Sequence, residues 1–370
     1  MISASQGTRL GPAGPASPTV AAVCPARTPA EIFWAHGIRT IELWDPPGVV
    51  AGQAAAHLPP MTCGVIRQGF DRLVVERSPG PDLLLFPHTC DSLQNLGSLM
   101  RDLMGEPRPC LFFCPPTGRS DGTAEAFFEA QIRALDAELD RLVGPARPGA
   151  LERALNWGWR RARLLRALYD RRAAGGWEVS NGRFYEAVRS CERQWPEEAM
   201  ARLEALLAEP AGEAPGHTPL VFSGVVPAPA DLLDRLDALG VRVAEDDFMA
   251  CGRRIPRGEA QDRGEKQIEE GGNPYRILAR RLLAAPPCST VGSPIGERLA
   301  FIESLVARSK SKGVVFLSLK FCEPDLFDVP SLAAGLKAQG IPVLSVDVEL
   351  GPATPAGLVT RIEAFLESLP

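Results

Sequence analysis

Short, uniformly apolar runs alternate with amphipathic segments toward both ends of the chain. Runs of this length, bounded by Gly, Pro or polar residues, are typical of buried strands. The runs that we predict to be strands are 40–43, 82–90, 109–114, 219–226, 241–247, 313–322 and 341–349, and a shorter segment that ends near Cys63 is assigned to the same class. Because runs such as 82–90 and 109–114 are almost uniformly apolar and alternate with helices, they predict parallel sheets that are covered on both faces.

The middle of the chain follows a helical period instead. From Thr123 to Leu207, apolar residues recur every three or four positions, which predicts a series of amphipathic helices. The predicted helices are 123–144, 151–174, 181–194 and 196–209. A Gly- and Pro-rich stretch at 209–219 then marks a boundary.

These patterns predict an α/β protein with two parallel-sheet domains and a helical segment between them. The predicted parts are a flexible tail at 1–20, an N-terminal α/β domain at 21–122, the helical segment at 123–216 and a C-terminal α/β domain at 217–370. A polar loop over 253–272 is long enough to be functional or mobile.

The composition is that of a globular protein with a full apolar core. Of 370 residues, 45% are hydrophobic, and the net charge is -5. This charge argues against nucleic acid or an anionic membrane as the main partner, although 40 Lys and Arg leave room for a local pocket that binds a phosphorylated ligand. The N-terminus lacks the apolar core of a signal peptide, and no apolar run approaches the ~20 residues that span a bilayer. We therefore expect a cytoplasmic protein with reduced thiols.

The nine cysteines are an odd number and fit no fully paired disulfide framework. Cys63, Cys90, Cys114 and Cys322 each follow a predicted strand, and Cys251 lies just past a fifth strand. Ligands of parallel sheets bind outside the carboxyl ends of the strands, so these thiols could converge in a cleft between two domains. Their long spacing, with no Cys-x-x-Cys pair, is unlike a zinc ribbon and is what a metal cluster held between domains would show.

Two plainer roles stay open for these thiols. A free cysteine at a strand end is often part of the core, and Cys110, inside the run 109–114, is best explained as strand packing. A cysteine nucleophile would need a histidine base, and His88, two residues before Cys90, is the local candidate. The sequence contains no Walker loop, no Gly-x-Ser-x-Gly motif and no His-Glu-x-x-His motif, so the residues alone assign no catalytic group.

Several segments resemble the 2-hydroxyacyl-CoA dehydratase and benzoyl-CoA reductase family. They are HTCDSLQNL from His88, LKFCEPDLFDVPSLAAGLKAQGIPVLSVDVE from Leu319 and LVTRIEAFLESL from Leu358. The segment CPARTPAEIFWAHGI from Cys24 is similar to the opening Cys-x-x-x-x-Pro-x-Glu pattern of that family. The resemblance runs from Cys24 to Pro370 and covers most of the chain.

The resemblance implies two flavodoxin-like (Rossmann-like) domains with an oxygen-sensitive 4Fe-4S cluster between them, held by three cysteines of each subunit. The matching positions are Cys63, Cys90 and Cys322, with Cys251 and Cys114 ranked behind them. Three thiolates on four irons leave one iron with an open coordination position for substrate or water. The implied partners are a homologous second subunit, in a hetero- or homodimer, and a separate ATP-hydrolysing iron–sulfur activator protein.

The implied function is low-potential electron transfer to an acyl-CoA thioester, followed by dehydration of a 2-hydroxyacyl-CoA or reduction of an aromatic ring. One alternative is a double-cubane 8Fe-9S cluster that reduces small molecules and uses Cys114, Cys251 and Cys24 as added ligands. Another alternative is a non-catalytic electron-relay subunit without a substrate of its own.

Two departures from the family pattern bear on this choice. Met249 stands where the family often has a cysteine, two positions before Cys251. Ser190-Cys191 replaces an expected Tyr-Asn pair in the helical segment.

Overall fold

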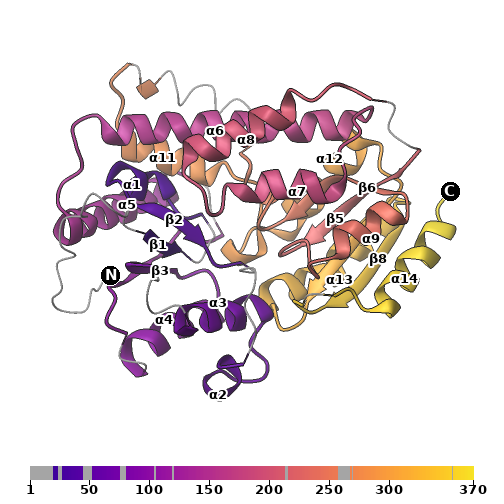
Figure 1. The fold of residues 1–370 in the computed structure, drawn as a ribbon, viewed down its shortest axis with the longest axis horizontal. Helices are drawn as coiled ribbons and strands as arrows, with labels where there is room; N and C mark the ends of the chain where they lie inside the picture. Colours follow the sequence, from indigo (N-terminus) through magenta and orange to yellow (C-terminus); the bar gives the residue numbers. More distant parts are fainter. Residues whose placement is uncertain are drawn as a thin grey trace. The chain divides into compact units, whose positions relative to one another are not determined.

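The computed structural model divides the chain into two compact units. It describes residues 20–23, 27–44, 52–75, 81–103, 106–118, 121–212, 216–256, 267–268, 270–351 and 353–370. Unit 1 comprises Met1–Ala162, Cys191–Ala199 and Pro256–Ala285, and unit 2 comprises Arg163–Ser190, Met200–Ile255 and Pro286–Pro370. Each unit contains one sheet and its helices, which can be followed by their labels in Figure 1.

The sheet of unit 1 has four parallel strands in the order β2-β1-β3-β4. The strands are β1 (Val20–Val23), β2 (Arg39–Glu42), β3 (Leu83–Pro87) and β4 (Cys110–Phe113). The helices of the unit are α1 (Ala30–Ala35), α2 (Ala54–His57), α3 (Gly64–Val75), α4 (Asp91–Ser98), which continues as the π-helix Leu99–Leu103, α5 (Gly122–Val143) and α11 (Pro274–Leu283). Every residue of β3 is buried, as its continuous apolar run requires in a sheet with both faces covered.

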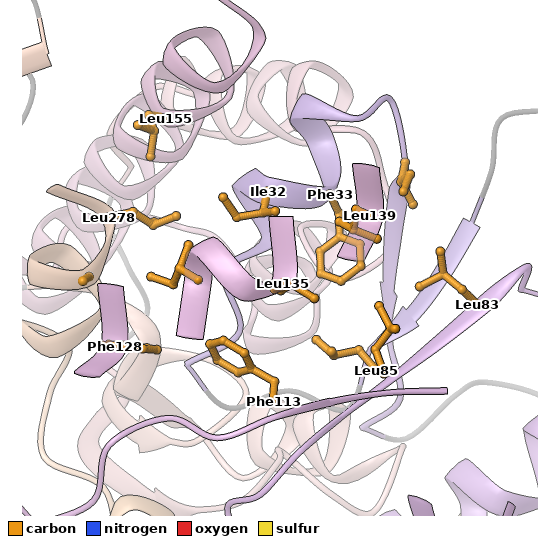
Figure 2. Packing of buried hydrophobic residues seen from close by; sticks show 14 of the residues in the cluster. Ile32, Phe33, Leu83, Leu85, Phe113, Phe128, Leu135, Leu139, Leu155 and Leu278 are labelled. Atoms are coloured by element: carbon orange, nitrogen blue, oxygen red, sulfur yellow. The ribbon is translucent and has the colours of Figure 1, made fainter. Parts of the chain in front are cut away.

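The core of unit 1 forms where α5 packs on the sheet and on α1 and α11. Figure 2 shows this packing, with Ile32 and Phe33 of α1, Leu85 of β3 and Phe113 of β4 around α5. The residues that α5 contributes, at the three- and four-residue spacing of one helix face, are Phe128, Ile132, Leu135, Leu139 and Leu142. Leu278 of α11 completes the cluster, so a segment late in the sequence belongs to the core of unit 1.

The sheet of unit 2 repeats the same strand order, β6-β5-β7-β8, again all parallel. The strands are β5 (Thr218–Gly224), β6 (Val241–Phe248), β7 (Val314–Leu319) and β8 (Val343–Val348). The helices of the unit are α7 (Asn181–Ser190), α9 (Leu232–Ala238), α12 (Ile295–Ser309), α13 (Glu323–Ala338) and α14 (Ala356–Glu367), with 3-10 turns at Gly252–Arg254 and Ser289–Val291. Two helices, α6 (Ala150–Ala174) and α8 (Pro196–Leu207), begin in unit 1 and end in unit 2. The sheet core of unit 2 includes Val221, Val314 and Phe316, covered by Ile302 of α12 and Leu332 of α13.

The predicted α/β class with parallel sheets is confirmed, and so is the helical character of the middle segment. The flavodoxin-like assignment and the predicted domain boundaries stay predictions, and the predicted tail lies outside the described residues except at its last position, Val20. The predicted strand before Cys63 is wrong, because α2 and a turn precede this cysteine. β1 and α11 were not predicted. Within the described stretches, no helix is both long and apolar enough to cross a membrane.

Candidate functional site: cysteines at helix starts

The three cysteines predicted as cluster ligands all lie at the start of a helix. Cys63 directly precedes α3, Cys90 is the N-cap residue of α4, and Cys322 is the N-cap residue of α13. The first N–H groups of a helix have no partner within the helix and form the positive end of its dipole. A thiolate at this position is therefore stabilised by the backbone.

Cys90 lies beyond the carboxyl end of β3, where the chain turns into α4. The backbone N–H groups of Leu93 and Ser92, at the start of α4, lower the pKa of its thiol. Burial, together with the neighbouring Cys63, nevertheless raises the pKa of the Cys90 thiol to about 11. The two sulfurs thus lie close enough for one thiolate to disfavour the other, and a bound cation would relieve this repulsion.

Cys63 has a matching environment. Its thiol is buried, which raises its pKa, while the nearby backbone N–H groups of Ile66 and Val65 oppose the rise. Without a metal, both thiols are therefore protonated at neutral pH. Metal binding at this pair would release protons, as expected for thiolate ligands.

A cavity of about 600 Å³ opens beside Cys90 at the carboxyl edge of this sheet. His88 and Asp91 line it next to Cys90, and Cys114 lines it from the end of β4. Phe127, on the first turns of α5, is 45% exposed and adds an apolar wall. Cys90 and Cys114 therefore face one cavity, whereas Cys110 is buried inside β4, where burial raises its pKa to about 12.

Cys322 belongs to unit 2, at the corresponding sheet edge. It follows β7 by three residues and is buried, and its carbonyl accepts a hydrogen bond from the Asp325 N–H at 3.1 Å. Phe321 just before it has a φ of 64°, in the left-handed region that bulky residues disfavour. Two further cysteines of unit 2 also start helical turns: Cys251 precedes Gly252–Arg254, and Cys288 precedes Ser289–Val291.

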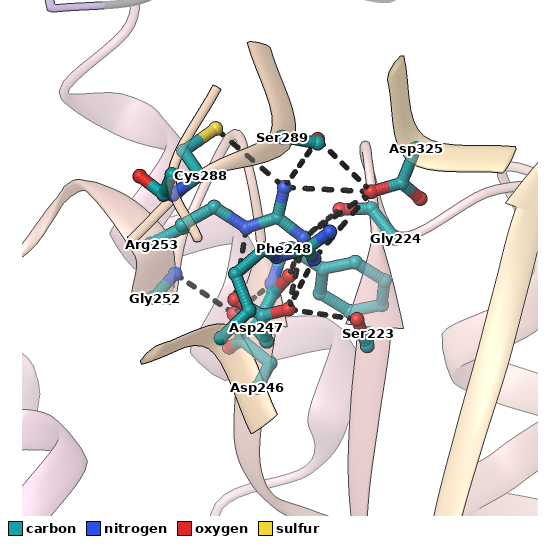
Figure 3. A network of polar contacts seen from close by, with 12 residues as sticks. Ser223, Gly224, Asp246, Asp247, Phe248, Gly252, Arg253, Cys288, Ser289 and Asp325 are labelled. Carbon is teal, nitrogen blue, oxygen red and sulfur yellow. Dashed lines mark hydrogen bonds and ion pairs between the residues drawn. The ribbon is translucent and has the colours of Figure 1, made fainter. Parts of the chain in front are cut away.

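A buried ionic network joins these turns, and Figure 3 shows it. Arg253 donates from Nε and Nη2 to the two carboxylate oxygens of Asp247, at 2.8 and 2.9 Å. Arg298 donates to the same carboxylate at 3.1 Å, and Ser223 Oγ donates to it at 2.8 Å. Burial by itself would raise the pKa of Asp247, but the two guanidinium groups lower it below the ordinary value. Asp247 is therefore a carboxylate in the core.

The thiol of Cys288 lies next to this ionic network and is affected by its charges. Its sulfur lies 3.6 Å from Arg253 Nη1 and 3.1 Å from Thr290 Oγ1. Burial alone would raise the pKa of this thiol, yet Arg253 and Thr290 bring it below the ordinary value. Neither Cys288 nor Arg253 was singled out from the sequence, because no motif marks them; only their spatial neighbours do.

Asp246, the residue beside Asp247, has the opposite character. It is fully buried and accepts hydrogen bonds from the hydroxyls of Tyr169 and Tyr185, each at 2.6 Å. Burial raises the pKa of Asp246 above its ordinary value, although these hydrogen bonds oppose the rise. Its Oδ1 also accepts from the N–H of Gly252 at 2.8 Å, which ties the turn that carries Arg253 to the end of β6.

The structure thus brings some predicted residues together within each unit. In unit 1, Cys63 lies near Cys90, and Cys90 shares a cavity with Cys114. In unit 2, Cys251 lies on the same turn as Arg253, whose partner Asp325 is three residues after Cys322. No three or more His, Cys, Asp or Glu side chains gather into a metal-binding group in the described part of the chain. Cys24, predicted as an added ligand, lies outside the described residues.

The two family departures have ordinary environments. Met249 is buried, and its N–H donates to the carbonyl of Gly224 at 3.0 Å. Ser190 Oγ donates to the carbonyl of Ala187 at 2.7 Å within α7, and Cys191 is buried.

The fold is that of an α/β protein with parallel sheets, in which cysteines lie between the carboxyl end of a strand and the start of the next helix. Residues 25–369 match the family described as 2-hydroxyglutaryl-CoA dehydratase, D-component, and the chain belongs to this family. The family resemblance stated from the sequence is confirmed.

Named relatives cover most of the chain at low identity. Lactoyl-CoA dehydratase subunit beta of Anaerotignum propionicum is 22% identical over 353 residues, which cover 94% of this chain and 91% of the relative. (R)-2-hydroxyglutaryl-CoA dehydratase subunit beta of Acidaminococcus fermentans is 22% identical over 356 residues, 93% of this chain and 91% of the relative. One benzoyl-CoA reductase subunit of Thauera aromatica is 22% identical over 337 residues, 88% of this chain and 84% of the relative. The chain is therefore similar to subunits of enzymes that are named for CoA thioesters.

Proposed function

We propose that this chain is one subunit of an enzyme that transfers low-potential electrons to an acyl-CoA thioester, either to dehydrate a 2-hydroxyacyl-CoA or to reduce a benzoyl-CoA-type ring. The family and the relatives support a subunit of this kind. The observation that carries the proposal is the pair Cys63 and Cys90, two neighbouring thiols at helix starts, of which Cys90 lines an open cavity.

A 4Fe-4S cluster fits the donor set of unit 1. Both thiols are soft ligands, and the backbone N–H groups at the start of each following helix favour the thiolate form, which suits a negatively charged iron–sulfur centre. We propose Cys63, Cys90 and Cys322 as the ligands and rank Cys114 and Cys251 behind them. When bound, such a cluster supplies the low-potential electron, and a separate ATP-hydrolysing activator would provide that electron.

The residues that line the cavity suit the proton transfers that the proposed reaction needs. Dehydration and ring reduction both require protons to be removed or added near the thioester. The imidazole of His88 and the carboxylate of Asp91 line the cavity next to Cys90 and can exchange such protons. Phe127 offers an apolar surface for an acyl chain or ring.

A second candidate is a subunit that relays electrons while its partner binds the substrate. The observation that favours it is Met249, which replaces a family cysteine in unit 2 with a buried thioether. A double-cubane 8Fe-9S cluster is a third candidate, favoured by Cys114 in the cavity of Cys90. Both of these candidates keep Cys63 and Cys90 as ligands.

The test is anaerobic purification, alone and with a co-expressed homologous subunit, followed by reconstitution with iron and sulfide. About four irons per chain support the single cluster, and about eight support the double cubane. Titration calorimetry with a 2-hydroxyacyl-CoA and with benzoyl-CoA then separates a substrate-binding subunit from a relay. A colourless, iron-free chain after reconstitution would contradict the proposal.

A further inference from the structure

Three cysteine-started turns of unit 2 meet at a single guanidinium group. Arg253 lies on the turn that Cys251 begins, and its Nη1 reaches the turn begun by Cys288 at the Cys288 sulfur, 3.6 Å away. The same Nη1 lies 3.4 Å from Asp325 Oδ1, on the first turn of the helix that Cys322 begins. Arg253 is thus the one side chain that contacts all three turns in the hydrogen bonds described for unit 2.

The anchor of Arg253 is rigid. Nε and Nη2 form a bidentate pair with Asp247, and Nη2 also donates to the Asp247 carbonyl at 2.9 Å. Both side chains are only 1% exposed. A bidentate, buried guanidinium–carboxylate pair has one favourable geometry. Asp247, near the end of β6, therefore determines the direction in which Nη1 of Arg253 points.

The turn at Cys322 contains a strained residue. Phe321, directly before the cysteine, has a left-handed backbone conformation, which persists only where the surrounding structure holds it. Asp325 provides a link to that structure, because its N–H donates to the Cys322 carbonyl at 3.1 Å and its carboxylate lies 3.4 Å from Arg253 Nη1 and Nη2. Figure 3 shows Asp325 reaching toward the guanidinium group from its own helix.

We propose that Arg253 is a positioning residue for Cys322, which it holds through Asp325. The inference rests on the proposed function in one respect: it gives the Cys322 thiol the role of a metal ligand. Arg253 links the first turn of α13 to the end of β6. The direction of the Cys322 sulfur therefore depends on the contact between Arg253 and Asp325, which are 72 positions apart in the sequence. The cysteine needs this support because a ligand must keep one geometry before the metal arrives.

Asp328 provides a matched comparison on the same helix. It lies one turn beyond Asp325 and accepts from Arg298 Nη1 at 2.6 Å, not from Arg253. An Asp328→Asn change therefore removes an ion pair of α13 and leaves the contact between Arg253 and Asp325 in place, while Arg298 stays 3.6 Å from Asp325 Oδ1 through its other nitrogen. A general loosening of the helix would appear in both variants, and a specific loss of support would appear only in the Asp325 variant.

The experiment uses the full metal-free chain under anaerobic conditions. The variants are Arg253→Lys, Asp325→Asn, the double variant and the control Asp328→Asn, each checked for folding by circular dichroism. Alkylation of Cys322 by iodoacetamide is followed by peptide mass spectrometry, with Cys110 as the internal reference. Lysine keeps the charge beside Asp247 but loses the planar guanidinium geometry. The variant therefore folds while Asp325 loses its contact with Arg253 and keeps those with Arg298, at 3.6 Å, and with Ser289 Oγ, at 3.4 Å.

We expect Cys322 to react roughly tenfold faster in Arg253→Lys and in Asp325→Asn, because the turn opens more often. The double variant should react no faster than either single variant, since both changes break the same link. After reconstitution, the same variants should lose iron to a chelator faster than the control does. Unchanged Cys322 reactivity, additive effects, or an equal effect of Asp328→Asn would overturn the proposal. If the wild-type chain binds no iron, the proposed function fails while the alkylation result still decides the role of Arg253.

Discussion

Cys90 and Cys322 occupy equivalent positions in the two sheets. Each lies three residues after the third strand in the order of its sheet, β3 or β7, and each is the N-cap residue of the helix that follows. The carboxyl edge next to the point where the strand order reverses is where parallel sheets bind their ligands. The equivalence indicates that both sheets present a thiol at the same kind of site.

Replacing Cys90 or Cys322 with Ser should abolish stable iron binding and leave the chain folded. Serine is nearly isosteric, but its hydroxyl stays protonated and is a poor ligand for iron, whereas a thiolate is soft and loses its proton beside a metal. Iron content and visible absorption after anaerobic reconstitution provide the measurement. Cys63→Ser should behave in the same way.

Cys110→Ser is the control for these variants. Cys110 is buried within β4 and away from the helix starts, so its loss should cost modest stability and no iron. Full iron content in Cys322→Ser would refute the ligand assignment and leave an ordinary buried thiol at the end of β7.

Alkylation of Cys90 in the metal-free chain should rise steeply with pH. Because its pKa is raised to about 11, only about one thiol in a thousand is ionised near pH 8. The rate should grow about tenfold for each pH unit up to about pH 11. The buried neutral thiol also contributes stability below its ordinary pKa of 9.0, and this contribution is lost as the pH rises toward about 11. A rate that levels off near pH 9 in a folded chain would contradict the raised pKa.

Lys310→Gly should stabilise unit 2. Lys310 is the C-cap residue of α12 and has a φ of 52°, a conformation that costs a residue with a side chain more than it costs glycine. We expect a gain of about 0.5–1 kcal/mol in the free energy of unfolding, measured by urea denaturation. Phe321→Gly removes a similar backbone strain, but it also removes a ring that is 45% exposed, so its gain in the free energy of unfolding should be smaller. A destabilised Lys310→Gly variant would show that the left-handed turn carries no such cost.

Asp136→Asn should destabilise unit 1 at neutral pH and much less in acid. Asp136 accepts hydrogen bonds from His36 Nε2 at 2.8 Å and from the Tyr275 hydroxyl, which link α5 to α1 and α11. Burial alone would raise the pKa of Asp136, but these partners lower it below the ordinary value of 3.8. The contribution is therefore present above that value and is lost as the pH falls through the lower, folded-state pKa.

Urea denaturation near pH 6 and near pH 3 provides the measurement for this pair. We expect Asp136→Asn to cost about 1–2 kcal/mol near pH 6, with a smaller difference from the wild type near pH 3. Asp140→Asn is the control, because its carboxylate is half exposed and lies 3.8 Å from His36 Nε2. An equal loss in both variants, or a loss that does not depend on pH, would argue against a stabilising role for the hydrogen bonds to the Asp136 carboxylate.

The sequence by itself determined the class of fold and the family. Continuous apolar runs predicted β3, β4, β5 and β7, because a strand covered on both faces must be apolar on both sides. A three- to four-residue spacing predicted α5 to α8. The segments around Cys90 and Cys322 contributed most to recognising the family, because their residues resemble its sequence over many consecutive positions.

Only the tertiary structure decided which side chains meet. β1 has four residues in a Gly- and Pro-rich part of the sequence, and α11 follows a stretch of polar residues, so neither has enough local pattern to be predicted. β1 forms by pairing with β2 and β3, and α11 packs on α5. The contact between Arg253 and Asp325 joins residues 72 positions apart. The parallel sheet brings the carboxyl ends of β6 and β7 to the same edge. A local pattern of apolar and polar residues cannot predict which side chains from these ends will contact a buried guanidinium group.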